Sequence, residues 1–137
     1  MSLDIFVDSF REGEPAGVSR DAVRSAFGRF VADVDQNCWR LRYDDTNFCD
    51  VDLSADEADP KKIGGFMISG PCGDERLWDA LVSILKLGAL VLHFEGRVAL
   101  VAAPNAVEHL PERIIEVFGP PRCTSTGHEI MAAIEDA

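Results

Sequence analysis

The second half of the sequence holds three side chains of types that carry out nucleophilic or acid–base chemistry: Cys72, His93 and Glu95. Cys72 comes just before an expected helix, and a thiol at a helix N-terminus ionises more readily than a free one. His93 and Glu95 lie two residues apart on an expected strand, so both side chains point to the same face. A histidine beside a carboxylate can act as an oriented general base. These residues predict a small enzyme or ligand-binding protein with a pocket between the sheet and the loop Gly13-Glu14-Pro15.

Each of these residues also has a structural explanation. Asp74 and Glu75 follow Cys72 closely and oppose formation of a thiolate, which favours a packed, unreactive thiol. A histidine near a strand end often hydrogen-bonds to a neighbour or points into solvent. His109 and His128 lie near expected helix boundaries without a second ligand, so the histidines predict no metal site. The glycine-rich motifs that bind phosphates and dinucleotides are absent from the sequence, and no cofactor is predicted.

A run of acidic side chains lies between residues 44 and 59, with no lysine or arginine among them. Its members are Asp44, Asp45, Asp50, Asp52, Asp56, Glu57 and Asp59. Three explanations stay open: a solvated loop, a docking face for a basic protein, or a divalent cation site. The spacing lacks the glycine and the final glutamate of an EF-hand loop. If the run binds a partner, we expect the charge to come from Asp44, Asp45, Asp56, Glu57 and Asp59.

The overall composition limits the classes of partner. The chain has 137 residues, of which 47% are apolar, so residues 1–137 fit a single domain with its own core. Its formal charge of −11 argues against nucleic acid or anionic lipid as a partner and allows a basic protein. No apolar run is long enough for a membrane span, and none near the N-terminus resembles a signal peptide. The four cysteines form no C-x-x-C pair, as expected for reduced thiols in a cytoplasmic protein.

An α+β domain would position these residues. Apolar alternation predicts strands at residues 3–10, 63–69, 89–94 and 98–103 and a hairpin at 39–53. Helical spacing predicts a helix at 19–31 with Ser19 as its N-cap and a second helix at 74–87. A capping box at Thr126-Gly-His-Glu129 predicts the last helix of a helical tail, at 127–136. The order βαβββαββ, followed by C-terminal helices, predicts an antiparallel or mixed sheet of about six strands with helices packed on one side. The nearest named architecture is the ferredoxin-like split β-α-β.

The expected hairpin has a definite register. A three-residue loop at Asp45-Thr46-Asn47 would place Arg42 opposite Asp50 and Arg40 opposite Asp52. A two-residue loop would mix polar and apolar side chains on one face, which a half-buried sheet disfavours. The strand aspartates would then be paired with arginines, and the acids outside the strands would stay free.

Two adjacent glycines, Gly64 and Gly65, interrupt the strand expected at 63–69. Glycine weakens a strand interior, because it has no side chain to pack and a large conformational freedom to lose. The pair therefore predicts either a β-bulge or a place where another part of the backbone approaches closely.

The sequence resembles a group of small uncharacterised bacterial proteins, first in its N-terminal pattern and then over most of the chain. The similarity rests on Asp4-Ile5-Phe6, on the motif Phe10-Arg11-x-Gly13-Glu14-Pro15-Ala16, and on Phe27, Trp39, Gly65-Phe66-Met67-Ile68 and Trp78. The resemblance implies a stand-alone bacterial domain and no particular activity. In size and charge the chain is also similar to immunity proteins, which neutralise secreted toxins. We therefore predict a non-catalytic protein-interaction domain whose acidic loop covers a basic site on a partner, with the small enzyme or ligand-binding protein as the alternative.

Overall fold

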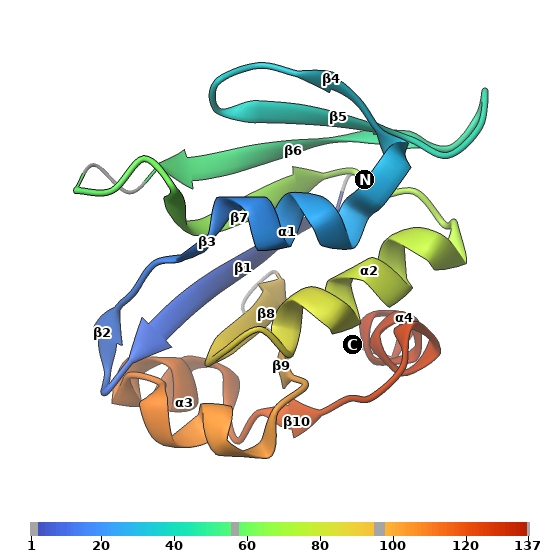
Figure 1. Ribbon diagram of the computed structural model, residues 1–137. Helices are drawn as coiled ribbons and strands as arrows, with labels where there is room; N and C mark the ends of the chain where they lie inside the picture. Colours follow the sequence, from blue (N-terminus) through green and yellow to red (C-terminus); the bar gives the residue numbers. More distant parts are fainter. Residues whose placement is uncertain (1–2, 56–57, 95–97, 137) are drawn as a thin grey trace.

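The computed structural model describes residues 3–55, 58–94 and 98–136. Within these ranges the strands form one sheet with helices packed against it (Figure 1). Six strands correspond to those predicted from the sequence: β1 (Asp4–Arg11), β5 (Cys38–Arg42), β6 (Phe48–Ala55), β7 (Lys62–Ser69), β8 (Leu90–Phe94) and β9 (Val98–Val101). The further strands are β2 (Glu14–Pro15), β3 (Val18–Ser19), β4 (Val31–Val34) and β10 (Arg122–Cys123). The predicted α+β class is confirmed.

The four central strands lie in the order β8-β1-β7-β6, and every neighbouring pair among them is antiparallel. Consequently β1 runs parallel to β6 and β7 runs parallel to β8, with one antiparallel strand inside each parallel pair. Helix α1 (Arg20–Phe27) lies in the connection from β1 to β6, and helix α2 (Glu75–Leu85) joins β7 to β8. These are two split β-α-β units, so the central topology is the ferredoxin-like arrangement expected from the sequence.

The sheet extends beyond this central unit on both sides. The β4–β5 hairpin is inserted between α1 and β6 and lengthens one edge, while β9 and the parallel strand β10 lengthen the other. The sequence did not predict β4, because residues 31–34 follow the apolar stripe of α1 without a clear break. The break comes from Gly28, whose φ of +66° ends the helix, and a 3-10 turn, η1 (Gly28–Phe30), leads into β4.

Helices α1, α2 and α4 (Gly127–Glu135) cover one face of the sheet. Two helix starts follow the predicted caps: the Ser19 hydroxyl accepts from the Ala22 N–H at 3.2 Å, and the Thr126 hydroxyl accepts from the Glu129 N–H at 3.2 Å. The main core lies between these helices and the sheet. Its largest fully buried side chains include Trp39, Phe27, Phe94, Ile5, Leu41 and Leu81.

The opposite face of the sheet is covered over only part of its width. The 3-10 helix η2 (Pro104–His109) and helix α3 (Glu112–Phe118) pack on the second side of β8 and β9, around Val91, Ala99 and Val101. This second cluster buries β8 and β9 on both faces, as their almost wholly apolar sequences require. The same face of β1, β7 and β6 has partly exposed side chains, including Phe6, which is 36% exposed.

The β5–β6 hairpin has the predicted faces but not the predicted register. Arg40 lies opposite Asp50, and Arg42 lies opposite Phe48. The loop starts one residue earlier than predicted, because the Tyr43 N–H donates to the Asn47 carbonyl at 2.8 Å. Each β5 residue therefore pairs with a β6 residue two positions earlier than predicted. A shift of two residues leaves every side chain on its predicted face of the sheet. The prediction of the faces is confirmed, and the prediction of the cross-strand partners is wrong.

The glycine pair in β7 accounts for a bulge and a close approach. The pairing with β6 is irregular where Gly65 lies opposite Ser54 and Ile63 lies opposite Ala55. A Cβ on Gly65 would lie 2.1 Å from the Val7 carbonyl oxygen, whereas the nearest atom to a Cβ on Gly64 would be 3.9 Å away. Both expectations for the glycines are therefore confirmed, with Gly65 at the close approach to β1.

Candidate functional site

The acids at the tip of the β5–β6 hairpin have partners within the hairpin. Asp44 Oδ1 accepts from the backbone N–H groups of Thr46 and Asn47 at 2.9 and 2.8 Å, and the Asn47 side-chain amide also donates to the carboxylate. These bonds, led by the one from the Asn47 side chain, hold the pKa of Asp44 well below its usual range. Asp45 accepts from Arg42 at 2.8 Å. The expectation that Asp44 and Asp45 are free is wrong, because Asp44 closes the turn and Asp45 takes the arginine expected for Asp50.

The second group of predicted partner-binding acids is only partly described. Asp59 Oδ1 accepts from the Lys61 N–H at 2.9 Å, so it shapes the turn that leads into β7. Asp56 and Glu57 lie outside the described residues. Within the described ranges, no three Asp, Glu, His or Cys side chains are arranged to hold a metal ion.

Cys72 and His93 do not share a site. Cys72 packs against the core on the helix side of the sheet, where its carbonyl accepts from Trp78 Nε1 at 3.1 Å. Its thiol lies beside Cys49, and burial raises the pKa of the Cys49 thiol to about 12. His93 lies on the opposite face of β8, since Leu92 and Phe94 belong to the helix-side core. Glu95, the third member of the predicted group, lies outside the described residues.

The structure brings His93 to Asp8 instead. His93 Nε2 lies 2.8 Å from Asp8 Oδ2, and the imidazole is only 18% exposed. Phe6 stacks on the imidazole at 5.3 Å between ring centroids, and Phe118 of α3 contacts it at 5.1 Å. An imidazole held by a carboxylate between two phenyl rings has a fixed orientation, as an oriented base or ligand-binding group requires.

A cavity of about 410 Å³ adjoins this pair. Its walls come from β1, from Pro15 and Gly64, and from α3, which contributes Arg113 and Val117. A pocket was predicted between the sheet and the Gly13-Glu14-Pro15 loop, and Pro15 does line this one. Asp8 was not predicted as part of it. Asp8 lies on the polar face of β1, but its approach to His93 depends on the pairing of β1 with β8, which is 85 residues away in the chain.

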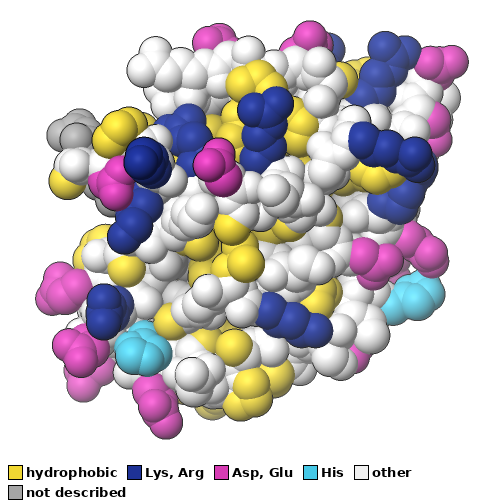
Figure 2. All heavy atoms as spheres, in the orientation of Figure 1, with side chains coloured by type: hydrophobic (Ala, Val, Ile, Leu, Met, Phe, Trp, Pro, Cys, Tyr) yellow, Lys and Arg dark blue, Asp and Glu magenta, His cyan; other side chains and the backbone are white. Residues whose placement is uncertain are grey.

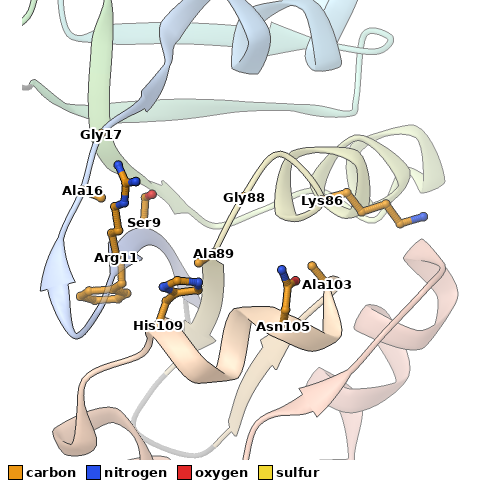
Figure 3. A pocket seen from close by; sticks show the side chains of 11 residues that line it. Ser9, Arg11, Ala16, Gly17, Lys86, Gly88, Ala89, Ala103, Asn105 and His109 are labelled. Carbon is orange, nitrogen blue, oxygen red and sulfur yellow. The ribbon is translucent and has the colours of Figure 1, made fainter.

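A second cavity of about 450 Å³ lies at the end of β1 near the β1–β2 hairpin (Figure 3). Its walls come from three separate segments. They are the hairpin region with Arg11 and Gly17, the α2–β8 turn with Ala89, and the η2 segment with Asn105 and His109. Three residues of the Phe10-Arg11-x-Gly13-Glu14-Pro15-Ala16 motif line this cavity: Phe10, Arg11 and Ala16.

One part of the sheet that the helices leave uncovered is called the open face. It consists of side chains of β1, β7 and β6 that point away from α1, α2 and α4: Asp4, Phe6, Met67, Ser69, Asp50 and Asp52. They form two rows across the sheet, because Asp4 lies opposite Ser69 and Ser69 opposite Asp50, while Met67 lies between Phe6 and Asp52. The apolar pair is therefore bordered by carboxylates.

The helix side of the molecule has a different charge distribution. Figure 2 shows most of its lysine and arginine side chains in the upper half of the view, over α1 and the β4–β5 strands. Two of the arginines are held by aromatic rings: Arg29 and Arg76 lie 5.1 and 4.8 Å from the ring centroid of Phe30. The helix side therefore presents a mixed surface with a basic region, in contrast to the open face.

Comparison with known proteins identifies no relative for this chain. No family model matches the sequence, and at the level of significance required neither a curated protein nor a solved structure matches it. Among the described residues, no helix combines the length and the apolar character that crossing a bilayer requires.

Proposed function

We propose that this chain is a non-catalytic protein-interaction domain that binds a basic protein partner through its open face. The observation that carries the proposal is the absence of helical cover over the described parts of β1, β7 and β6. A sheet face with carboxylates around an exposed Phe6 and a half-buried Met67 has the composition of a recognition surface, with an apolar centre and a polar border.

The charge of the chain favours a basic partner. The formal charge is −11, and the six positions of the open face include three aspartates and no lysine or arginine. Arg40 of β5 neutralises one of them, since it lies 3.0 Å from Asp50. Asp4 and Asp52 therefore provide most of the negative potential that would steer a basic partner.

In its most specific form, the proposal is an immunity-type protein that covers the basic site of a toxin. The structure changes which acids would do this. Asp44 and Asp45 hold their own hairpin together, so the charge would come from the open face instead of the hairpin tip. Size and acidity are the properties that this chain shares with immunity proteins, and both suit a protein that masks a cationic surface.

A binding assay with a charge-neutralising pair of variants tests this proposal. The first probe is an extended peptide of alternating lysine and phenylalanine, and the second is any basic protein retained from a bacterial lysate and identified by mass spectrometry. Asp4→Asn with Asp52→Asn should weaken binding by about two- to thirtyfold, since exposed ion pairs contribute roughly 0.2–1 kcal/mol each and two of them are removed. The control is Asp21→Asn with Glu135→Gln, which removes the same charge from exposed positions on α1 and α4.

Binding should also weaken steeply as salt is raised through about 0.15 M, where the Debye length is about 8 Å. Equal loss of binding in both double variants would point to net charge alone and would reject the open face as the site. Binding that does not depend on salt would contradict the electrostatic part of the proposal.

A second candidate function is favoured by the Asp8–His93 pair. Asp8 engages Nε2, and no residue in the described ranges hydrogen-bonds to Nδ1, so Nδ1 would contact a ligand in the adjoining cavity. The protein would then be a ligand-binding protein or a small enzyme in which Asp8 replaces Glu95 as the orienting carboxylate. A fragment screen by ligand-detected NMR should find compounds that bind the wild type and not His93→Phe, a variant that keeps the ring stacking. A screen without any His93-dependent ligand would reject this candidate.

A further inference from the structure

The cavity beside the β1–β2 hairpin differs in charge from the rest of this acidic chain. Acidic residues number 24 among 137, yet none of the eleven residues that line the cavity is Asp or Glu. Glu12, Glu14 and Glu108 are close in the sequence but do not line it. The lining instead includes Arg11, Lys86, His109 and Asn105, all of which can donate hydrogen bonds.

The backbone at the hairpin turn fixes the histidine of this cavity. The Glu12 N–H donates to His109 Nδ1 at 3.2 Å, and the Gly13 N–H donates to the His109 carbonyl at 2.9 Å. Glu12 has a φ of +52°, a conformation that is strained for a residue with a side chain and that these bonds help to hold. Since Nδ1 accepts a hydrogen bond, the neutral imidazole carries its proton on Nε2, which is then a donor.

Three of these four donor side chains come from β1 and η2. In Figure 3, Arg11 extends alongside Ala16 and Gly17, while His109 and Asn105 project from η2 toward the α2–β8 turn. Arg11 forms no ion pair with a described carboxylate. Lys86 contributes its stem to the rim, and its amine points away from His109.

We propose that this cavity binds a small molecule with an oxyanion group, either a carboxylate or a phosphate, attached to a compact apolar body. The Arg11 guanidinium and the donors of His109 and Asn105 would contact the oxyanion, because an arginine matches the planar geometry of such groups. Phe10, Ala89 and Ala103 supply apolar wall for the rest of the molecule. A volume of about 450 Å³ is within the range of small-molecule sites in proteins. This site is separate from the open face, so the two proposals can fail independently.

The test uses benzoate, phenyl phosphate and neutral benzyl alcohol as probes, with binding followed by NMR of the Arg11 guanidinium and the His109 ring. At least one anionic probe should bind, with shifts at both residues, and benzyl alcohol should bind at least about tenfold more weakly. The two anions distinguish a carboxylate site from a phosphate site.

Variants then assign the effect to the cavity. Arg11→Gln should weaken binding of the anion by about tenfold or more, while Arg24→Gln, which removes the same charge from exposed α1, should leave it unchanged. Binding of the lysine–phenylalanine peptide to the open face should not change in Arg11→Gln. The proposal is overturned if neither anion binds at millimolar concentration, if benzyl alcohol binds equally well, or if Arg11→Gln and Arg24→Gln have the same effect.

Discussion

Substitution of Gly65 by alanine should destabilise the protein and separate Asp8 from His93. The added Cβ would lie 2.1 Å from the Val7 carbonyl oxygen, 3.1 Å from Asp8 Cα and 2.9 Å from Asp8 Oδ1. The first two of these atoms belong to the backbone of β1, which pairs with β7 in the middle of the sheet. Neither strand can move away without breaking the hydrogen bonds between them.

The size of the effect follows from this geometry. Overpacking a rigid site typically costs about 1–3 kcal/mol, and a clash with the backbone of a central strand belongs at or above the upper end. We expect Gly65→Ala to lower the free energy of unfolding by about 3 kcal/mol or more, a large part of the stability of an ordinary domain. The matched control is Gly64→Ala, where the nearest atom is 3.9 Å away and the change should stay within about 1 kcal/mol.

Urea denaturation followed by tryptophan fluorescence measures both variants, since Trp39 and Trp78 are buried in the core. NMR of the His93 ring adds a local readout, because Asp8 must shift in Gly65→Ala and stay in place in Gly64→Ala. Equal stability of the two variants would refute the close approach of β7 to β1 and with it the account of how Asp8 is positioned.

Three further predictions concern other parts of the chain. Gly127→Ala should detach the start of α4 from α2 and lower stability by about 2 kcal/mol or more in urea denaturation, because its Cβ would lie 2.8 Å from the Asp79 backbone nitrogen. The pKa of Asp44 is lower in the folded protein than in the unfolded chain. The Asp44 carboxylate should therefore stabilise the fold at pH values above its unfolded pKa, and this stabilisation should be lost as the pH falls through its folded pKa. An NMR titration of the Asp44 carboxyl carbon measures that folded pKa. Maleimide labelling at neutral pH followed by mass spectrometry should modify exposed Cys123 first and buried Cys49 only on unfolding, and rapid labelling of Cys49 in the folded state would contradict its burial.

The parts of the fold set by local patterns could be predicted from the sequence. Strand faces and helix starts depend on neighbouring residues, so the alternation in β5 and β6 and the caps at Ser19 and Thr126 were interpreted correctly. The pairing within the hairpin was wrong because Asp44 hydrogen-bonds to the turn and starts the loop one residue earlier. The alternation of polar and apolar residues does not indicate a hydrogen bond between an aspartate side chain and the backbone of a turn.

The candidate sites depend on contacts between distant segments, which the sequence pattern does not specify. His93 was recognised as a candidate, but its partner Asp8 reaches it through the register of two strands far apart in the chain. His109 likewise lines the cavity beside the β1–β2 hairpin because of long-range contacts. Its hydrogen bonds to Glu12 and Gly13 join residues that are 97 and 96 positions apart in the sequence. Cys72 lies on the other side of the sheet, a separation that only the arrangement of the strands determines.

Chemical-shift mapping of the isotope-labelled protein with the lysine–phenylalanine peptide tests the open-face proposal most directly. The account predicts that the largest shifts fall on Asp4, Phe6, Met67 and Asp52, that they weaken with added salt, and that Asp4→Asn with Asp52→Asn reduces them. Shifts centred on the Asp44-Asp45 turn or on α1, or an absence of shifts at the open face at saturating peptide, would contradict the claim that this face is the binding surface.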